Sequence, residues 1–129
     1  MIQVERDDLV RALKGFKGIA KQDLLLQDFS PQSKYRKTHA EARREIYTKL
    51  IDLVEEDGIT EACVFALSEY HKSSDFTKAT DSMVSGRLQA LELFFSLLGI
   101  TSDKFMVLKD ISINQLFELV PPVQGNVYL

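Results

Sequence analysis

Residues 88–98 read LQALELFFSLL and form the most apolar stretch of the chain. Eight of these eleven residues are apolar, and on a helical wheel they cover well over half of the circumference. A helix that is apolar on so many sides is normally a central one, in contact with several neighbours. The stretch therefore predicts a helix over residues 79–98 that is central to an all-α fold and ends at Gly99.

Other segments repeat apolar residues at helical spacing, which predicts helices over residues 7–24, 38–57 and 60–72. A short helix over 102–109 and a last one, with a capping box from Ser112 and a stop before Pro121, complete the chain. Short connections predict antiparallel neighbours. We expect one helical domain over residues 1–129, an all-α compact bundle of five or six helices with an apolar C-terminal tail.

The sequence Gly-Ile-Thr occurs twice between predicted helices, at Gly58 to Thr60 and at Gly99 to Thr101. In each copy the glycine is placed to end one helix and the threonine to cap the next. The repeat indicates either a duplicated helical unit or two independent junctions that use the same residues to end one helix and begin the next. The second interpretation is favoured, because little outside the two junctions matches.

The composition is that of an ordinary globular domain, with 129 residues, 45% of them hydrophobic and 27% charged. Its net charge of −3 excludes a general polycation for nucleic acid or anionic lipid. One cysteine, Cys63, excludes a disulfide within the chain, and no apolar stretch is long enough to span a membrane. We expect a cytoplasmic protein without membrane contact.

The sequence lacks the short motifs that mark most enzymes, such as a nucleophile elbow, a phosphate-binding glycine loop or a zinc-protease signature. Cys63 and His71 lie eight residues apart on one predicted helix, too far apart to share a metal or to act as a nucleophile and base. We therefore expect no enzyme, no cofactor and no metal.

Positive charge gathers between residues 34 and 44, opposed there by Glu41 alone, and the residues that carry it are Lys34, Arg36, Lys37, Arg43 and Arg44. Acidic residues dominate from 45 to 61, so the predicted helix has its charges reversed relative to its macrodipole. This reversal opposes local stability, which makes the basic segment a candidate surface for a phosphate or an acidic partner. The alternative is a solvated face with pairs such as Glu41–Arg44 and Glu45–Lys49.

Arg87 lies near the middle of the apolar arc of the predicted 79–98 helix. It is expected either to pair with a buried carboxylate, the favoured alternative, or to face a groove or a subunit contact. Arg43 also falls inside an apolar arc, but near a helix end where it could extend to water.

Gly15 and Gly18 frame a Gly-x-x-Gly sequence of the kind that KH domains use to hold a nucleic-acid backbone. The neighbouring sequence predicts no strands for such a domain, so a close helix approach or a kink is favoured instead.

These patterns favour a non-catalytic helical protein-interaction module: a small regulator, adaptor or inhibitor that associates with itself, as a homodimer, or with a protein partner. Its suspected contact residues are the basic segment, Arg87, and Tyr128 and Leu129 of the apolar tail. The alternative is a nucleic-acid-binding regulator that uses the same basic segment and a stripe of Arg11, Lys14, Lys17 and Lys21. An enzyme with dispersed carboxylates is the weakest candidate.

Overall fold

A computed structural model describes residues 5–26, 30–74 and 81–120. Within these ranges it contains no strand, and it confirms the predicted all-α bundle. The elements are α1 (Arg6–Leu25), α2 (Ser33–Glu56), α3 (Ile59–Ser74), α4 (Ser82–Leu97), the 3-10 turns η1 (Ser102–Lys104) and η2 (Val107–Lys109), and α5 (Ile113–Leu119). The predicted short helix over 102–109 is thus two separate 3-10 turns.

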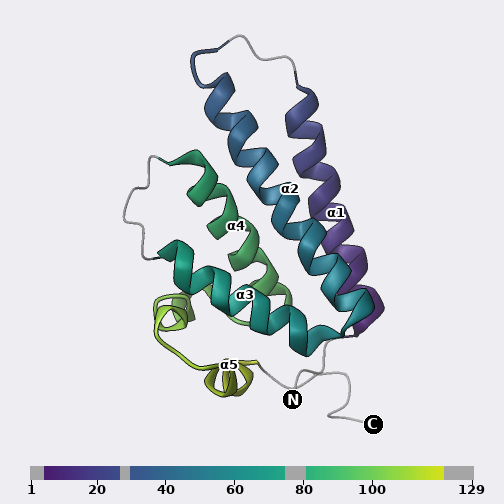
Figure 1. Ribbon diagram of the computed structural model, residues 1–129, viewed down its shortest axis with the longest axis vertical. Helices are drawn as coiled ribbons and strands as arrows, with labels where there is room; N and C mark the ends of the chain where they lie inside the picture. Colours follow the sequence, from purple (N-terminus) through teal and green to yellow (C-terminus); the bar gives the residue numbers. More distant parts are fainter. Residues whose placement is uncertain (1–4, 27–29, 75–80, 121–129) are drawn as a thin grey trace.

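Helix α2 occupies the middle of the bundle (Figure 1). It packs along the antiparallel α1 on one side and along α4 on the other, and it also touches α3. Its seven buried residues spread over about half of the helix circumference, which allows it to serve two neighbours. Helix α4 is contacted by α1, α2 and α3, as its apolar surface predicts, but the two largest interfaces in the bundle both belong to α2.

The predicted apolar faces form the core. All four residues predicted for the face of α3 are buried, namely Cys63, Ala66, Leu67 and Tyr70. On α1, Leu9, Leu13 and Ala20 are buried, whereas Phe16 and Leu24 are half-buried. Tyr70 ties α3 to α4, because its hydroxyl donates to Glu92 Oε2 at 3.0 Å.

Both predicted glycine stops adopt the left-handed conformation, with φ of 103° at Gly58 and 94° at Gly99. The threonines do not cap as predicted. Helix α3 already begins at Ile59, which places Thr60 inside its first turn, and the Thr101 hydroxyl bonds the Asp103 carboxylate instead of a helix amide. The two junctions therefore both end a helix at a glycine, but the next helix begins in a different way at each.

The start of α5 follows the prediction, with a complete capping box between Ser112 and Gln115. The start of α2 does not, because the helix begins at Ser33, five residues before the predicted position. Residues 33–37 lack apolar periodicity, but their lysines and arginine are good helix formers and no proline interrupts them. The basic segment is thus helical from its first residue.

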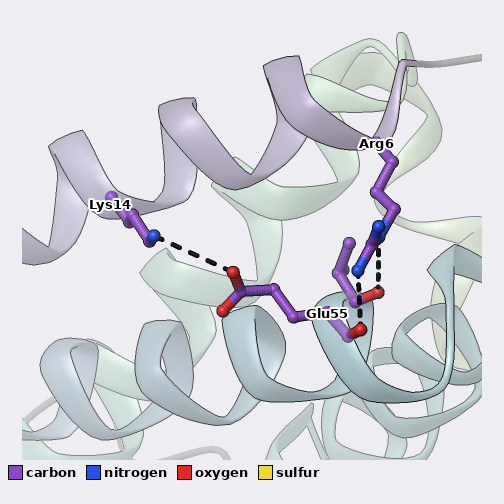
Figure 2. A network of polar contacts seen from close by, with 4 residues as sticks. Arg6, Lys14 and Glu55 are labelled. Atoms are coloured by element: carbon purple, nitrogen blue, oxygen red, sulfur yellow. Dashed lines mark hydrogen bonds and ion pairs between the residues drawn. The ribbon is translucent and has the colours of Figure 1, made fainter.

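Arg6, in the first turn of α1, stabilises the far end of α2 (Figure 2). Its guanidinium donates from Nε to the Val54 carbonyl at 3.2 Å and from Nη2 to the Glu55 carbonyl at 2.6 Å. Lys14 Nζ lies 3.9 Å from the Glu55 carboxylate. These cations from α1 offset the acidic residues and the negative dipole at the end of α2, where the helix has no basic residue of its own in its last turn.

We expect Arg6→Ala to lower the free energy of unfolding by about 1 kcal/mol, because two α2 carbonyls lose a charged donor. Arg11→Ala is the matched control, since Arg11 is an exposed α1 arginine whose partner among the described residues is Asp8 of its own helix. Its effect should stay within about 0.5 kcal/mol. Urea denaturation measures both, and equal losses would contradict the role given to Arg6.

Helices α2 and α4 approach each other closely at Gly86. A Cβ atom at this position would lie 2.4 Å from the His39 carbonyl oxygen and 3.0 Å from the Ala42 Cβ. By contrast, a Cβ at Gly15 or Gly18 would meet nothing within 4 Å. The expectation that the α1 glycines permit a close helix approach is therefore wrong. The residue that permits one is Gly86, and α1 is a continuous helix through both of its glycines.

Gly86→Ala should destabilise the protein by about 1–3 kcal/mol, because the added methyl group must push α4 away from α2. Gly18→Ala adds the same methyl group to an exposed helical position and should instead stabilise by up to about 1 kcal/mol. Thermal unfolding followed by circular dichroism compares the two. A Gly86→Ala protein as stable as the parent would contradict the packing at this crossing.

Candidate functional site

The candidate site lies where α1 ends and α2 begins. With 24 residues α2 is about 36 Å long, whereas the 16 residues of α4 span about 24 Å. The end of the α1–α2 pair consequently projects beyond the start of α4 (Figure 1). Most of the basic segment belongs to this projecting end.

A pocket of about 250 Å³ opens between the two helices here. Two of its lining residues come from the end of α1 and its C-cap, and the others come from the first three turns of α2. The lining residues are Asp23, Leu26, Ser33, Tyr35, Arg36, Lys37, His39 and Arg43. The fold thus brings three of the predicted cations, Arg36, Lys37 and Arg43, to one hollow.

Arg43 is the fixed cation of the pocket. Its Nη2 donates to Asp23 Oδ2 at 2.6 Å, and only 11% of its side chain is exposed. The Nε atom is buried and has no hydrogen-bond partner among the residues that the structure describes. The expectation that Arg43 extends to water at a helix end is therefore wrong, because α2 begins ten residues before it and α1 covers it.

His39 and Tyr35 form an aromatic wall beside these cations. Their rings are stacked, with centroids 6.2 Å apart. Burial lowers the pKa of His39, the neighbouring Arg43 lowers it further, and Asp23 partly counteracts both. His39 is therefore a neutral ring at pH 7, and the formal charges of the lining residues sum to +2.

The first turn of α2 adds to the positive potential. It contains no acidic residue, and its N-cap, Gln32, makes no side-chain capping bond. The backbone amides of Lys34 and Tyr35 have no hydrogen-bond partner among the described residues. The positive end of the helix dipole thus lies beside cationic side chains with no acid in this turn to offset it.

We expect the imidazole of His39 to titrate below pH 6.5 in the folded protein. Arg43→Gln should raise this midpoint, because the substitution removes a nearby cation and leaves the Asp23 carboxylate without its partner. The titration is followed through the His39 ring signals by NMR. A midpoint that does not move in Arg43→Gln would contradict the proximity of the two side chains.

Two of the predicted contact residues on α2 lie outside the pocket. Arg44 lines a different hollow of about 400 Å³, where Glu41, Glu45 and Asp52 surround it together with Lys17, Lys49 and Thr48. Lys34 is exposed and belongs to neither hollow. The pairs Glu41–Arg44 and Glu45–Lys49 of the alternative interpretation form no ion pair in the described chain.

Arg87 is half-buried on α4, and it makes no ion pair or hydrogen bond with the described residues. The favoured expectation of a buried carboxylate partner is therefore wrong. Arg87 lies on the buried side of α4, among Ala90, Leu91 and Phe94 on the helical wheel, but in the second turn of the helix, where its long side chain is only half-buried. Tyr128 and Leu129, and the predicted docking of the apolar tail, lie outside the described residues.

The basic stripe predicted on α1 is partly neutralised. Arg11 pairs with Asp8 at 3.4 Å, Lys14 lies 3.9 Å from Glu55, and Lys17 lines the hollow that contains the acids of α2. The stripe therefore does not form a continuous cationic track.

The sequence did not single out Asp23 and Leu26 for the site. One signal for Asp23 was available, because an acidic residue near the C-terminal end of a helix opposes the macrodipole unless a cation meets it. Leu26 is 52% exposed and Leu25 is 72% exposed, which is unusual for two adjacent leucines at a helix end.

Other chemistry-bearing groups do not extend the site. Cys63 is fully buried, and this burial raises the pKa of its thiol to about 12, so it is an unreactive core residue. Within residues 5–26, 30–74 and 81–120, no group of three or more His, Cys, Asp or Glu side chains is placed to hold a metal ion. None of the helices described combines the length and apolarity needed to cross a membrane.

The chain matches no protein family model, no curated protein and no solved structure. Its function must be inferred from the side chains that the fold brings together.

Proposed function

We propose that this protein is a non-catalytic interaction module, and that it binds an acidic segment of a partner protein in the pocket between α1 and α2. One observation carries the proposal: the pocket combines the cations Arg36, Lys37 and Arg43 with the aromatic wall of Tyr35 and His39. Complementary charge steers such a partner towards the site, and a buried arginine with a fixed orientation adds specificity.

The surroundings favour a protein partner over nucleic acid. Leu25, Leu26 and Tyr35 are exposed beside or within the pocket and offer apolar contacts to peptide side chains. Nucleic acid requires a series of cations along its backbone, and the ion pairs on α1 interrupt such a series. The roles of regulator, adaptor or inhibitor, self-association as a homodimer and a cytoplasmic location belong to the same proposal.

The test measures the binding of a fluorescein-labelled peptide with four glutamates around one leucine, by fluorescence anisotropy at two salt concentrations. Lys37→Glu should weaken binding by about fivefold or more and reduce its salt dependence. Arg44→Glu is the matched control, since it makes the same change on α2 but in the other hollow. It should change the Kd by less than about twofold.

A peptide with glutamines in place of the glutamates and a generic duplex DNA are measured in parallel. Equal effects of Lys37→Glu and Arg44→Glu would reject the pocket as the binding site. Tighter binding to the duplex than to the acidic peptide, lost in Lys37→Glu, would favour the nucleic-acid alternative.

A further inference from the structure

We infer that an acidic partner segment binds the pocket between α1 and α2 together with a proton, which the imidazole ring of His39 takes up from the solvent. The inference rests on the proposed function and adds control by pH to the same site. Binding should therefore strengthen as the pH falls from about 7.5 to about 5.5. The position of His39, the charges that face it and the contrast with His71 support the inference.

His39 lies where a ligand must come close to it. Its half-buried ring lines the pocket and stacks on Tyr35, one helical turn earlier. A pocket of about 250 Å³ is only about 8 Å across, so a carboxylate inside it stays near the ring. An opposite charge within about 4–6 Å of a histidine favours its charged form.

The ring nitrogens of His39 are available to a proton. No described residue forms a hydrogen bond with either of them, and neither is one of the buried polar atoms that lack a partner. One nitrogen of a neutral imidazole has a free lone pair. A proton from the solvent can bind there without breaking a hydrogen bond, and the new N–H group can donate to a ligand carboxylate.

In the free protein, the groups of α1 and α2 that face His39 keep it neutral at pH 7. Burial lowers its pKa, Arg43 lowers it further, and Asp23 of α1 counteracts both only in part. The other charged residues of the pocket are Arg36 and Lys37, which are both cations. Asp23 is thus the one carboxylate among the lining residues, and it is already paired with Arg43.

Helix α4 packs against α2 on the other side and supplies no free carboxylate. It meets the backbone carbonyl of His39 at Gly86, and the charged residue next to this contact is the cation Arg87. The acids of α4 and of its N-cap are engaged elsewhere, because Glu92 accepts a hydrogen bond from α3 and Asp81 caps α4. A ligand must therefore bring the second carboxylate that charging His39 requires.

The direction of the pH effect follows from this arrangement. A ligand carboxylate raises the pKa of His39, so the complex holds more protons than the free protein at pH values near the two midpoints. Affinity consequently rises as the pH falls through this range. Below about pH 5 the affinity falls again, because glutamates in the ligand have a pKa near 4.3 and lose their charge.

His71 is the matched control, because the chain has two histidines and this one lies outside both hollows. Its Nε2 atom is 2.9 Å from the carbonyl oxygen of Leu108, which ties α3 to η2. A ligand between α1 and α2 should not change its titration.

The experiment measures the four-glutamate peptide, with both ends blocked, by isothermal titration calorimetry at pH 5.5, 6.5 and 7.5. Two buffers of different ionisation enthalpy at each pH give the number of protons taken up. The parent protein should bind about fivefold more tightly at pH 5.5 than at pH 7.5, and it should take up about half a proton near pH 6. The peptide with glutamines in place of the glutamates should show neither effect.

His39→Gln should abolish both the tightening and the proton uptake, whereas His71→Gln should retain them. Circular dichroism establishes that each variant is folded. A measurement on the parent protein needs no variant: a saturating amount of the peptide should raise the NMR titration midpoint of the His39 ring and leave that of His71 unchanged.

The possible failures are distinguishable. Equal affinity at the three pH values without proton uptake would overturn this inference while the proposed function stands. Tightening that persists in a folded His39→Gln protein, or a His39 midpoint that the peptide does not raise, would also overturn it. Binding of the glutamate peptide no tighter than that of the glutamine peptide at any pH would overturn both proposals.

Discussion

The contact between Gly86 of α4 and the backbone of α2 at His39 is the constraint on which much of the bundle depends. A methyl group there would lie 2.4 Å from a carbonyl oxygen, so the two helices pack at a distance that only glycine permits. This approach places α4 against the middle helix and leaves α1 to cover its other side. His39, whose carbonyl faces Gly86 of α4, also lines the pocket, so the pocket lies next to this close approach of the two helices.

Helix α2 has basic residues near its N-terminus and acidic residues near its C-terminus, an order that its dipole disfavours. Different contacts offset these charges at the two ends. At the C-terminal end, Arg6 and Lys14 of α1 meet the carbonyls and the carboxylate that the helix cannot neutralise itself (Figure 2). Near the N-terminal end, Asp23 pairs with Arg43, but no described acid pairs with Lys37 or Lys34. The reversal is thus compensated at the C-terminal end by cations of α1 and, near the N-terminal end, by the pairing of Asp23 with Arg43.

Much of the fold could be predicted from the sequence, because burial along α3 and most of α1 follows the 3.6-residue period. The start of α2 could not be predicted, since residues 33–37 have no apolar face. The close approach at Gly86 could not be predicted either, because it depends on where two helices that are distant in the sequence cross. The candidate site was predicted in part. The predicted basic segment contains Arg36, Lys37 and Arg43, which line the pocket, but Arg44 points in a different direction from its neighbour Arg43 on the helix and lines another hollow. Asp23 was missed because its partner lies 20 residues away, across a connection whose length does not determine the register of the two helices.

The projection of the α1–α2 end past α4 has an evolutionary consequence. Along the central part of α2, a change in side-chain volume must be accommodated by helices on two sides, which restricts the acceptable substitutions. Exposed positions on the projecting turns, such as Lys34 and Lys37, carry no such restriction. The side chains at these positions can therefore change among descendants of this chain, while the bundle that supports them stays the same.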